Sequence, residues 1–96
     1  MLQGKRENIK RIHALVSGKV QGVFFRYHTV RKAQKEGLKG WVRNTEDDRV
    51  EAVAEGGKEA LEDFISFLWE GSPQAEVEDV RVEWQEPEGE SDFFVK

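Results

Sequence analysis

The 96-residue sequence has no cysteine, only two prolines and no apolar run approaching the about 20 residues that cross a membrane as a helix. The missing cysteines exclude disulfide bonds, thiolate nucleophiles and zinc sites of the cysteine type. The first residues are charged and no apolar segment follows them, which argues against a signal peptide. Length and composition predict one cytoplasmic domain that does not associate with membranes.

Acidic residues outnumber basic ones, giving a formal net charge of −4, but the two signs are unevenly distributed. Residues 1–54 hold 12 Lys and Arg against 6 Asp and Glu, whereas residues 55–96 hold 3 against 13. The basic half favours attraction of a small anion. The acidic half repels a long polyanion such as RNA, so nucleic-acid binding is not expected. Most of the individual charges are typical of an ordinary solvated surface.

Apolar residues alternate or recur at helical spacing, so the secondary structure can be predicted from periodicity. Strands are predicted at residues 10–17, 38–44, 50–54 and 77–84, with a possible short strand at 93–95, and helices at 25–36 and 58–70. The order βαββαβ predicts an α+β fold, a ferredoxin-like split βαβ sandwich with both helices on one face of an antiparallel sheet. The first strand should be central because both of its sides are partly apolar. Residues 1–9 are predicted to be a flexible extension and residues 10–96 the folded domain.

Two glycines four positions apart, Gly18 and Gly22, follow the first strand. Glycine takes positive φ without penalty, so the chain can turn here and present successive N–H groups to an anion. Arg26, in the first helical turn, is opposed by the helix dipole unless an anion lies beside its planar guanidinium. An anion site is therefore a hypothesis, although many such turns bind nothing. Neither dinucleotide-type nor P-loop spacing is present, so nucleotide binding is not indicated.

The stretches GKVQGVFFR (18–26) and GLKGWVRN (37–44) resemble the two signature stretches of acylphosphatases in residue type and spacing. The resemblance extends over about residues 10–96. It departs in the hairpin, where Asp47-Asp48 stands in place of the usual Asp-Gly. Aspartate tolerates a left-handed conformation better than most residues, so a slightly costlier turn is expected.

This resemblance implies a monomeric hydrolase that cleaves the carboxyl-phosphate bond of acyl phosphates without a metal or other cofactor. It implies that Asn44 positions the attacking water. Inorganic phosphate or sulfate is expected to compete with the substrate. The residues implied to bind the phosphoryl group are Gly18, Lys19, Val20, Gln21, Gly22, Val23 and Arg26.

The chemistry of these residue types is consistent with that reaction. Arg26 stays protonated, so it can bind a phosphoryl group but cannot act as a base. His13 is expected to be a structural or surface residue, and His28 points away from Arg26 around the helix toward solvent. The carboxylate leaving group is weakly basic, so the substrate's own phosphate could accept the proton.

Two other functions stay open on the sequence alone. A ferredoxin-like sandwich can bind RNA through aromatic side chains on its open face, although the sequence has no RNP-type stretch with interleaved basic and aromatic residues. A phosphate-sensing domain without turnover would use the same loop and Arg26. Asn44, taken by itself, is more typical of a strand-end residue that caps a turn, and only the loop opposite it favours a catalytic role.

Overall fold

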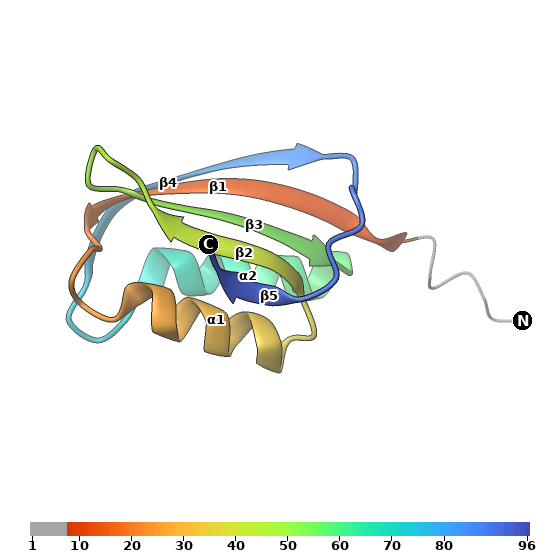
Figure 1. Cartoon of the computed structure of the whole chain (residues 1–96), viewed down its shortest axis with the longest axis horizontal. Coiled ribbons are helices and arrows are strands. Elements are labelled where there is room, and N and C mark those ends of the chain that lie inside the picture. Colours follow the sequence, from red (N-terminus) through yellow and green to blue (C-terminus); the bar gives the residue numbers. More distant parts are fainter. Residues whose placement is uncertain (1–7) are drawn as a thin grey trace, which may run out of the picture.

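A computed structural model describes residues 8–96, which form a five-stranded sheet with two helices against it (Figure 1). In chain order the elements are β1 Lys10–Lys19, α1 Phe25–Lys35, β2 Lys39–Asn44, β3 Val50–Gly56, α2 Lys58–Glu70, β4 Glu76–Gln85 and β5 Phe93–Val95. The strand order is β4-β1-β3-β2-β5, antiparallel except where β5 runs parallel to β2. The predicted ferredoxin-like fold is confirmed. Most of the predicted extension, residues 1–9, lies outside the described residues.

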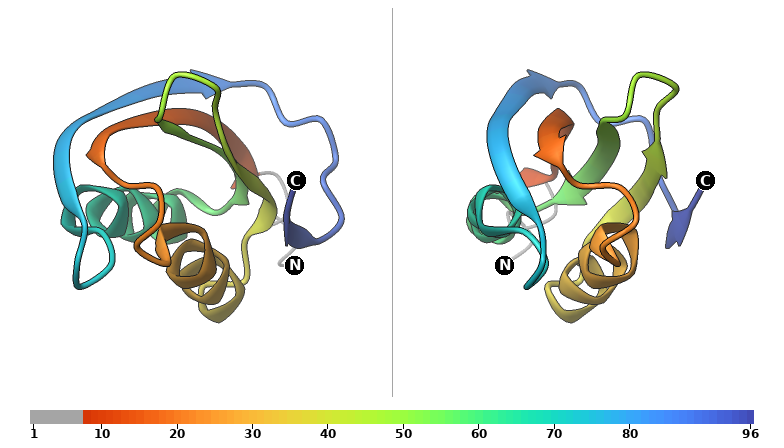
Figure 2. Two further views of the ribbon diagram at one scale, coloured as in Figure 1. Left: turned by 60° about the vertical axis from the view of Figure 1, so that its left-hand side comes forward. Right: turned by 90° about the vertical axis from the view of Figure 1, so that its left-hand side faces the viewer.

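Both helices lie on the same side of the sheet, and the core fills the space between the two layers (Figure 2). Ile12, Ala14 and Val16 of β1 are fully buried, as their alternation predicts. Leu61, Phe64 and Leu68 supply the buried stripe of α2, also at the predicted helical spacing. β1 lies between β3 and β4, which confirms its central place. No helix in residues 8–96 is long and apolar enough to cross a membrane.

β1 continues two residues beyond its predicted end at Ser17 because Gly18 allows β4 to approach closely. The pairing between β1 and β4 shifts register between Ser17 and Gly18, and Gly18 has φ +126°. A Cβ atom on Gly18 would lie 2.2 Å from the carbonyl oxygen of Glu76. This glycine therefore serves the strand pairing as well as the turn that follows.

A charged cluster closes the end of the sheet at which β1 begins; we call it the Arg11–Glu55 cluster. The carboxylate of Glu55 is buried and accepts hydrogen bonds from the backbone N–H groups of Glu88, Gly89 and Glu90 at 2.6, 3.1 and 3.0 Å. Arg11 donates a further bond to Glu55 at 2.7 Å. These contacts fix the connection between β4 and β5, which places β5 beside β2.

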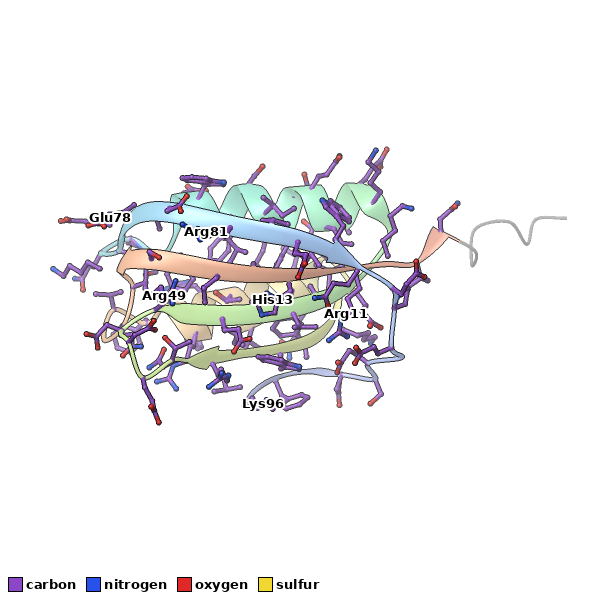
Figure 3. All side chains as sticks on the ribbon, turned by 90° about the horizontal axis from the view of Figure 1, so that it is seen from above. Arg11, His13, Arg49, Glu78, Arg81 and Lys96 are labelled. Atoms are coloured by element: carbon purple, nitrogen blue, oxygen red, sulfur yellow. The ribbon has the colours of Figure 1, made fainter. Side chains whose placement is uncertain are left out.

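The face of the sheet opposite the helices carries an ordered set of charges (Figure 3). His13 Nε2 lies 2.6 Å from a carboxylate oxygen of Glu51, and Arg43 donates to the other oxygen at 2.6 Å. The Lys96 ammonium lies 4.2 Å from the centroid of the Trp41 ring. His13 thus contacts Glu51 on the surface of the sheet, which agrees with its prediction as a structural or surface residue.

Candidate active site

A cleft of about 510 Å³ lies where the loop between β1 and α1 meets the end of β2. It brings together the glycine turn, the first turn of α1 and the end of the second predicted motif. Its lining residues are Val20, Gly22, Phe24, Phe25, Arg26, Tyr27, Val30, Asn44 and Val95. The predicted site residues Val20, Gly22, Arg26 and Asn44 thus share one cleft, although 18 positions separate Arg26 from Asn44 in the sequence.

The turn itself begins later than its sequence motif. Gly18 and Lys19 belong to β1 and pair with β4, so their place is beside the cleft rather than in its lining. Gly22 has φ +75°, and a Cβ added to it would meet nothing within 4 Å. Glycine is favoured at this position by the backbone conformation and not by lack of space. The Val23 side chain is buried in the core and fixes the far side of the turn.

The amino-terminal end of α1 faces the cleft without a side-chain cap. Phe24, the N-cap residue, has φ 60° and ψ 23°, and the first turn of α1 contains no acidic residue. The first N–H groups of a helix have no intrahelical acceptor, and the helix dipole is positive there. This end of α1 is therefore suited to an anionic ligand. Of the two neighbouring phenylalanines, Phe25 is buried in the core and Phe24 is exposed.

Arg26 is exposed at the cleft and forms no ion pair or side-chain hydrogen bond with any residue of 8–96. Its guanidinium is thus available to an outside anion. Within the same part of the chain, no three His, Asp or Glu side chains gather where a metal ion could be held. The charge available to a ligand in the cleft is therefore that of Arg26 and the helix terminus.

Asn44 is the last residue of β2, and its Oδ1 atom is buried with no hydrogen-bond partner among residues 8–96. A buried acceptor without a partner costs about 1–3 kcal/mol, so such atoms are uncommon unless they serve a ligand or water. The turn that Asn44 was alternatively expected to cap is instead capped by the next residue, Thr45. The backbone N–H of Arg49 donates to Thr45 Oγ1 at 3.0 Å, and Thr45 N–H donates to the Arg49 carbonyl at 2.8 Å.

The side chain of Gln21 connects the anion loop to the hairpin that follows Asn44. Its Nε2 donates to the carbonyl oxygens of Thr45 and Arg49 at 3.0 and 2.8 Å. Sequence reasoning included Gln21 only for its place in the loop and missed this link, because no local pattern indicates a side chain that bridges two turns. The two halves of the candidate site are therefore held together directly.

Ser72, in the turn after α2, supports the loop from the other side. Its buried hydroxyl donates to the carbonyl oxygen of Val23 at 2.7 Å. Ser72 is not among the site residues that the sequence predicts. A separation of 49 positions gave no signal for the contact.

The hairpin between β2 and β3 has the backbone expected from its aspartates. Asp48 has φ 70°, which confirms that aspartate takes the left-handed position there. Asp47 accepts hydrogen bonds from Arg49 and from the Thr45 hydroxyl, and these lower the pKa of Asp47 to about 2. The turn that follows Asn44 is therefore braced by side chains as well as by its backbone.

Neither histidine is among the residues that line the cleft. His28, which the sequence predicts to face solvent, is partly exposed. Its ring packs edge-on against Tyr27 with the centroids 5.2 Å apart. The prediction that His28 lies apart from the site of Arg26 agrees with the cleft lining.

Comparison with known proteins identifies the chain's relatives. The acylphosphatase family model matches residues 12–95. An acylphosphatase of Nostoc sp. is 54% identical over 86 residues, which cover 90% of this chain and 85% of that protein. The corresponding protein of Trichormus variabilis is 52% identical over the same coverage. The solved structure of an acylphosphatase from Coxiella burnetii superposes with a TM-score of 0.92 at 46% identity and covers all of both chains.

The family model, the relatives and the solved structure agree over nearly the whole folded part of the chain. They agree also with the resemblance carried by the stretches 18–26 and 37–44. The chain therefore belongs to the acylphosphatase family and is an enzyme that hydrolyses acyl phosphates.

Proposed function

We propose that this enzyme holds the phosphoryl group of its substrate on the backbone amides of residues 20–23 and on the guanidinium of Arg26, while Asn44 orients the attacking water. The observation that carries the proposal is the meeting of Gly22, Arg26 and Asn44 in one cleft, with the Asn44 Oδ1 atom unpartnered. Because one chain supplies all the lining residues, a monomer has a complete site.

Binding of the phosphoryl group comes first. Its oxygens accept hydrogen bonds from the loop amides and the first N–H groups of α1, where the helix dipole favours negative charge. The planar guanidinium of Arg26 holds two of these oxygens at once. Because Arg26 has no ion pair with the described protein residues, it needs to break none when the ligand arrives.

Hydrolysis then requires a water in line with the bond that breaks. Asn44 Oδ1 accepts a hydrogen bond from this water and so directs its oxygen at phosphorus. The new bond joins the water oxygen to phosphorus, and the bond from phosphorus to the carboxylate oxygen breaks. The carboxylate leaves with the electron pair, and a phosphoryl oxygen accepts the water proton.

No divalent metal is needed in this mechanism. The leaving group is a weakly basic carboxylate, so it departs without the assistance that a metal gives a poorer leaving group. The charge of the phosphoryl group is balanced by Arg26 and oriented N–H dipoles. Inorganic phosphate or sulfate, which offers the same oxygens, should compete with the substrate.

The test is hydrolysis of acetyl phosphate by protein treated exhaustively with EDTA, measured as released phosphate above the spontaneous rate. We expect full turnover, with inorganic phosphate as a competitive inhibitor. A loss of rate that magnesium or zinc restores would contradict the metal-free mechanism. Phosphate binding without any turnover would instead indicate a sensing domain.

A titration with inorganic phosphate, followed by NMR, tests the binding loop separately. The amide signals of residues 20–25 should shift together and saturate at the inhibition constant. If those signals remain fixed while others shift, the phosphoryl group binds elsewhere.

A further inference from the structure

Three exposed apolar side chains stand around the cleft; we call Phe24, Tyr27 and Val95 the apolar collar. Their exposed fractions are 74, 53 and 47%. Exposed apolar groups that gather at a cleft indicate a surface for ligand contact, whereas scattered ones need no explanation. Trp69, equally exposed at 50%, lies on α2 and is not part of the cleft lining.

Phe24 combines its exposure with an uncommon backbone conformation. Its φ of 60° and ψ of 23° are left-handed, a region that bulky side chains rarely occupy. Outliers of this kind concentrate at ligand clamps and active sites. An aromatic ring at this position contributes little to the core, so its apolar surface is available in the cleft.

Tyr27 is held at the rim by its neighbours on α1. Its hydroxyl accepts a hydrogen bond from Arg31 Nη1 at 2.9 Å, and the Arg31 guanidinium lies 5.7 Å from the ring centroid. The His28 ring packs against the same tyrosine. A ring ordered before the ligand arrives loses little freedom on binding.

We propose that the apolar collar binds the acyl portion of the substrate, and that the enzyme prefers acyl phosphates with an aromatic or branched aliphatic acyl group. The inference rests on the proposed function, since a phosphoryl group on the loop places the attached acyl group inside the same cleft. Among the described residues, the only charged side chain in the cleft lining is Arg26, which the phosphoryl group engages. A charged acyl group would find no partner there, whereas an apolar one is removed from water.

Contacts with the acyl group change little during the reaction, because bonds form and break at phosphorus. The collar should therefore lower KM for apolar substrates more than it raises kcat. This distinguishes the collar from Asn44, which acts on the reacting water.

The kinetic test compares benzoyl phosphate with acetyl phosphate in the wild type, Phe24→Ala, Tyr27→Ala and the control Trp69→Ala. We expect Phe24→Ala to lower kcat/KM for benzoyl phosphate about tenfold more than kcat/KM for acetyl phosphate, on the scale of a lost apolar pocket contact. Tyr27→Ala should act in the same direction, and Trp69→Ala should affect neither substrate. Thermal unfolding of each variant identifies any loss of folded protein.

A binding experiment separates failure of this inference from failure of the proposed function. Phenacylphosphonate and acetonylphosphonate mimic the two substrates but cannot be hydrolysed, since a methylene replaces the bridging oxygen. The wild type should bind the phenacyl compound more tightly, and Phe24→Ala should reduce that preference. If the wild type binds the phenacyl compound more tightly but hydrolyses neither substrate, only the proposed function is overturned. Equal binding of both phosphonates by the wild type, or an undiminished preference in both collar variants, would overturn the inference.

Discussion

The two ends of the sheet differ in whether their polar groups have hydrogen-bond partners among the described residues. Where β1 begins, Glu55 accepts three backbone N–H groups and a guanidinium, and Arg11 also bonds to Gln85 and Glu90. Where β1 ends, the Asn44 Oδ1 atom is buried without a described partner, and Arg26 has no described ion pair. At one end of the sheet, the buried polar groups are therefore satisfied by hydrogen bonds, and at the other end Asn44 and Arg26 are not satisfied by any described residue.

Because of this difference, we expect one end of the sheet to contribute to stability and the other to ligand binding and catalysis. Satisfied buried charges rigidify a structure and are costly to disturb. Unsatisfied groups weaken the folded state slightly but are ready to bind a ligand, which is how stability and function commonly trade against each other. Substitutions at the first end should therefore alter stability, and substitutions at the second should alter catalysis.

The largest effect should come from Arg26→Ala. We expect kcat/KM to fall about a thousandfold, on the scale known for arginines that bind a transferred phosphoryl group, and phosphate binding to weaken severely. Arg26→Lys should also lose most activity, because a point charge cannot hold two oxygens in a plane. Steady-state kinetics and phosphate titration on the same samples measure both effects.

Lys35→Ala is the control, since it removes an exposed cation from the other end of α1. It should leave kcat/KM within about twofold, as expected for a surface charge outside the site. If the Arg26→Ala variant still bound phosphate strongly, Arg26 would not be part of the phosphate-binding site.

Glu55→Ala should produce the corresponding effect on stability. Removing one partner of a buried charged pair costs about 3–5 kcal/mol, and here Arg11 and the N–H groups of residues 88–90 lose their acceptor. The free energy of unfolding in urea should fall by that amount, while kcat of the folded protein is unchanged. Glu62→Ala, an exposed site on α2, should cost less than about 0.5 kcal/mol.

The same carboxylate predicts an acid dependence. Burial alone raises the pKa of Glu55, but hydrogen bonds from Arg11 and from the backbone of residues 88–90 lower that pKa below its ordinary value of 4.5. Its contribution to stability is present above the unfolded pKa and is lost as pH falls through the folded one. Wild-type stability should therefore decline below about pH 4.5, with a shallower decline in Glu55→Gln. If stability declines equally with pH in the wild type and in Glu55→Gln, groups other than Glu55 cause the acid sensitivity.

Asn44→Ala should reduce kcat about a hundredfold, the effect of losing one positioned transition-state contact. Phosphate binding should change only a few-fold, because Asn44 contacts the water rather than the phosphoryl group. Stability should not fall, since Oδ1 has no hydrogen bond to lose among the described residues. A loss of phosphate binding as large as that in Arg26→Ala would contradict the proposed division between the two residues.

Gln21→Ala should have the smallest effect on kcat, because Gln21 acts only by holding the hairpin that orients Asn44. Removing its bonds to the carbonyls of Thr45 and Arg49 should lower kcat about tenfold, equivalent to about 1.4 kcal/mol. In the Asn44→Ala background the same change should have little further effect, since the orientation of Asn44 no longer matters. Fully additive losses in the double variant would show that Gln21 acts independently of Asn44.

Most of the fold could be predicted from the sequence because its determinants are local. The alternation around Ile12 and the helical spacing around Phe64 correctly predicted a central strand and a buried helix stripe. The positions of Arg26 and Asn44 could be predicted because both lie in short motifs with characteristic spacing. The conformation of Asp48 followed from the preferences of a single residue type.

What could not be predicted depends on contacts between distant positions. Val95 lines the cleft only because β5 pairs with β2, and the buried role of Glu55 depends on a connection more than thirty positions away. Whether Asn44 or Thr45 braces the turn is decided by side-chain geometry that residue type alone leaves open. The extra residues of β1 likewise follow from the close approach of Glu76.

The central position of β1 has a consequence for how the protein forms. β1 is synthesised first among the strands, yet its partner β4 follows much later, and the pairing of Arg11 with Gln85 spans 74 positions. Pairings of such long range are slow to form, and an unpaired strand edge invites association with other chains. The cations Lys10, Arg11 and Lys19 at the ends of β1 oppose such association. The pairing of β1 with β4 can form only after residues 76–85 have left the ribosome, and we expect the charges at the ends of β1 to disfavour association of the nascent chain until then.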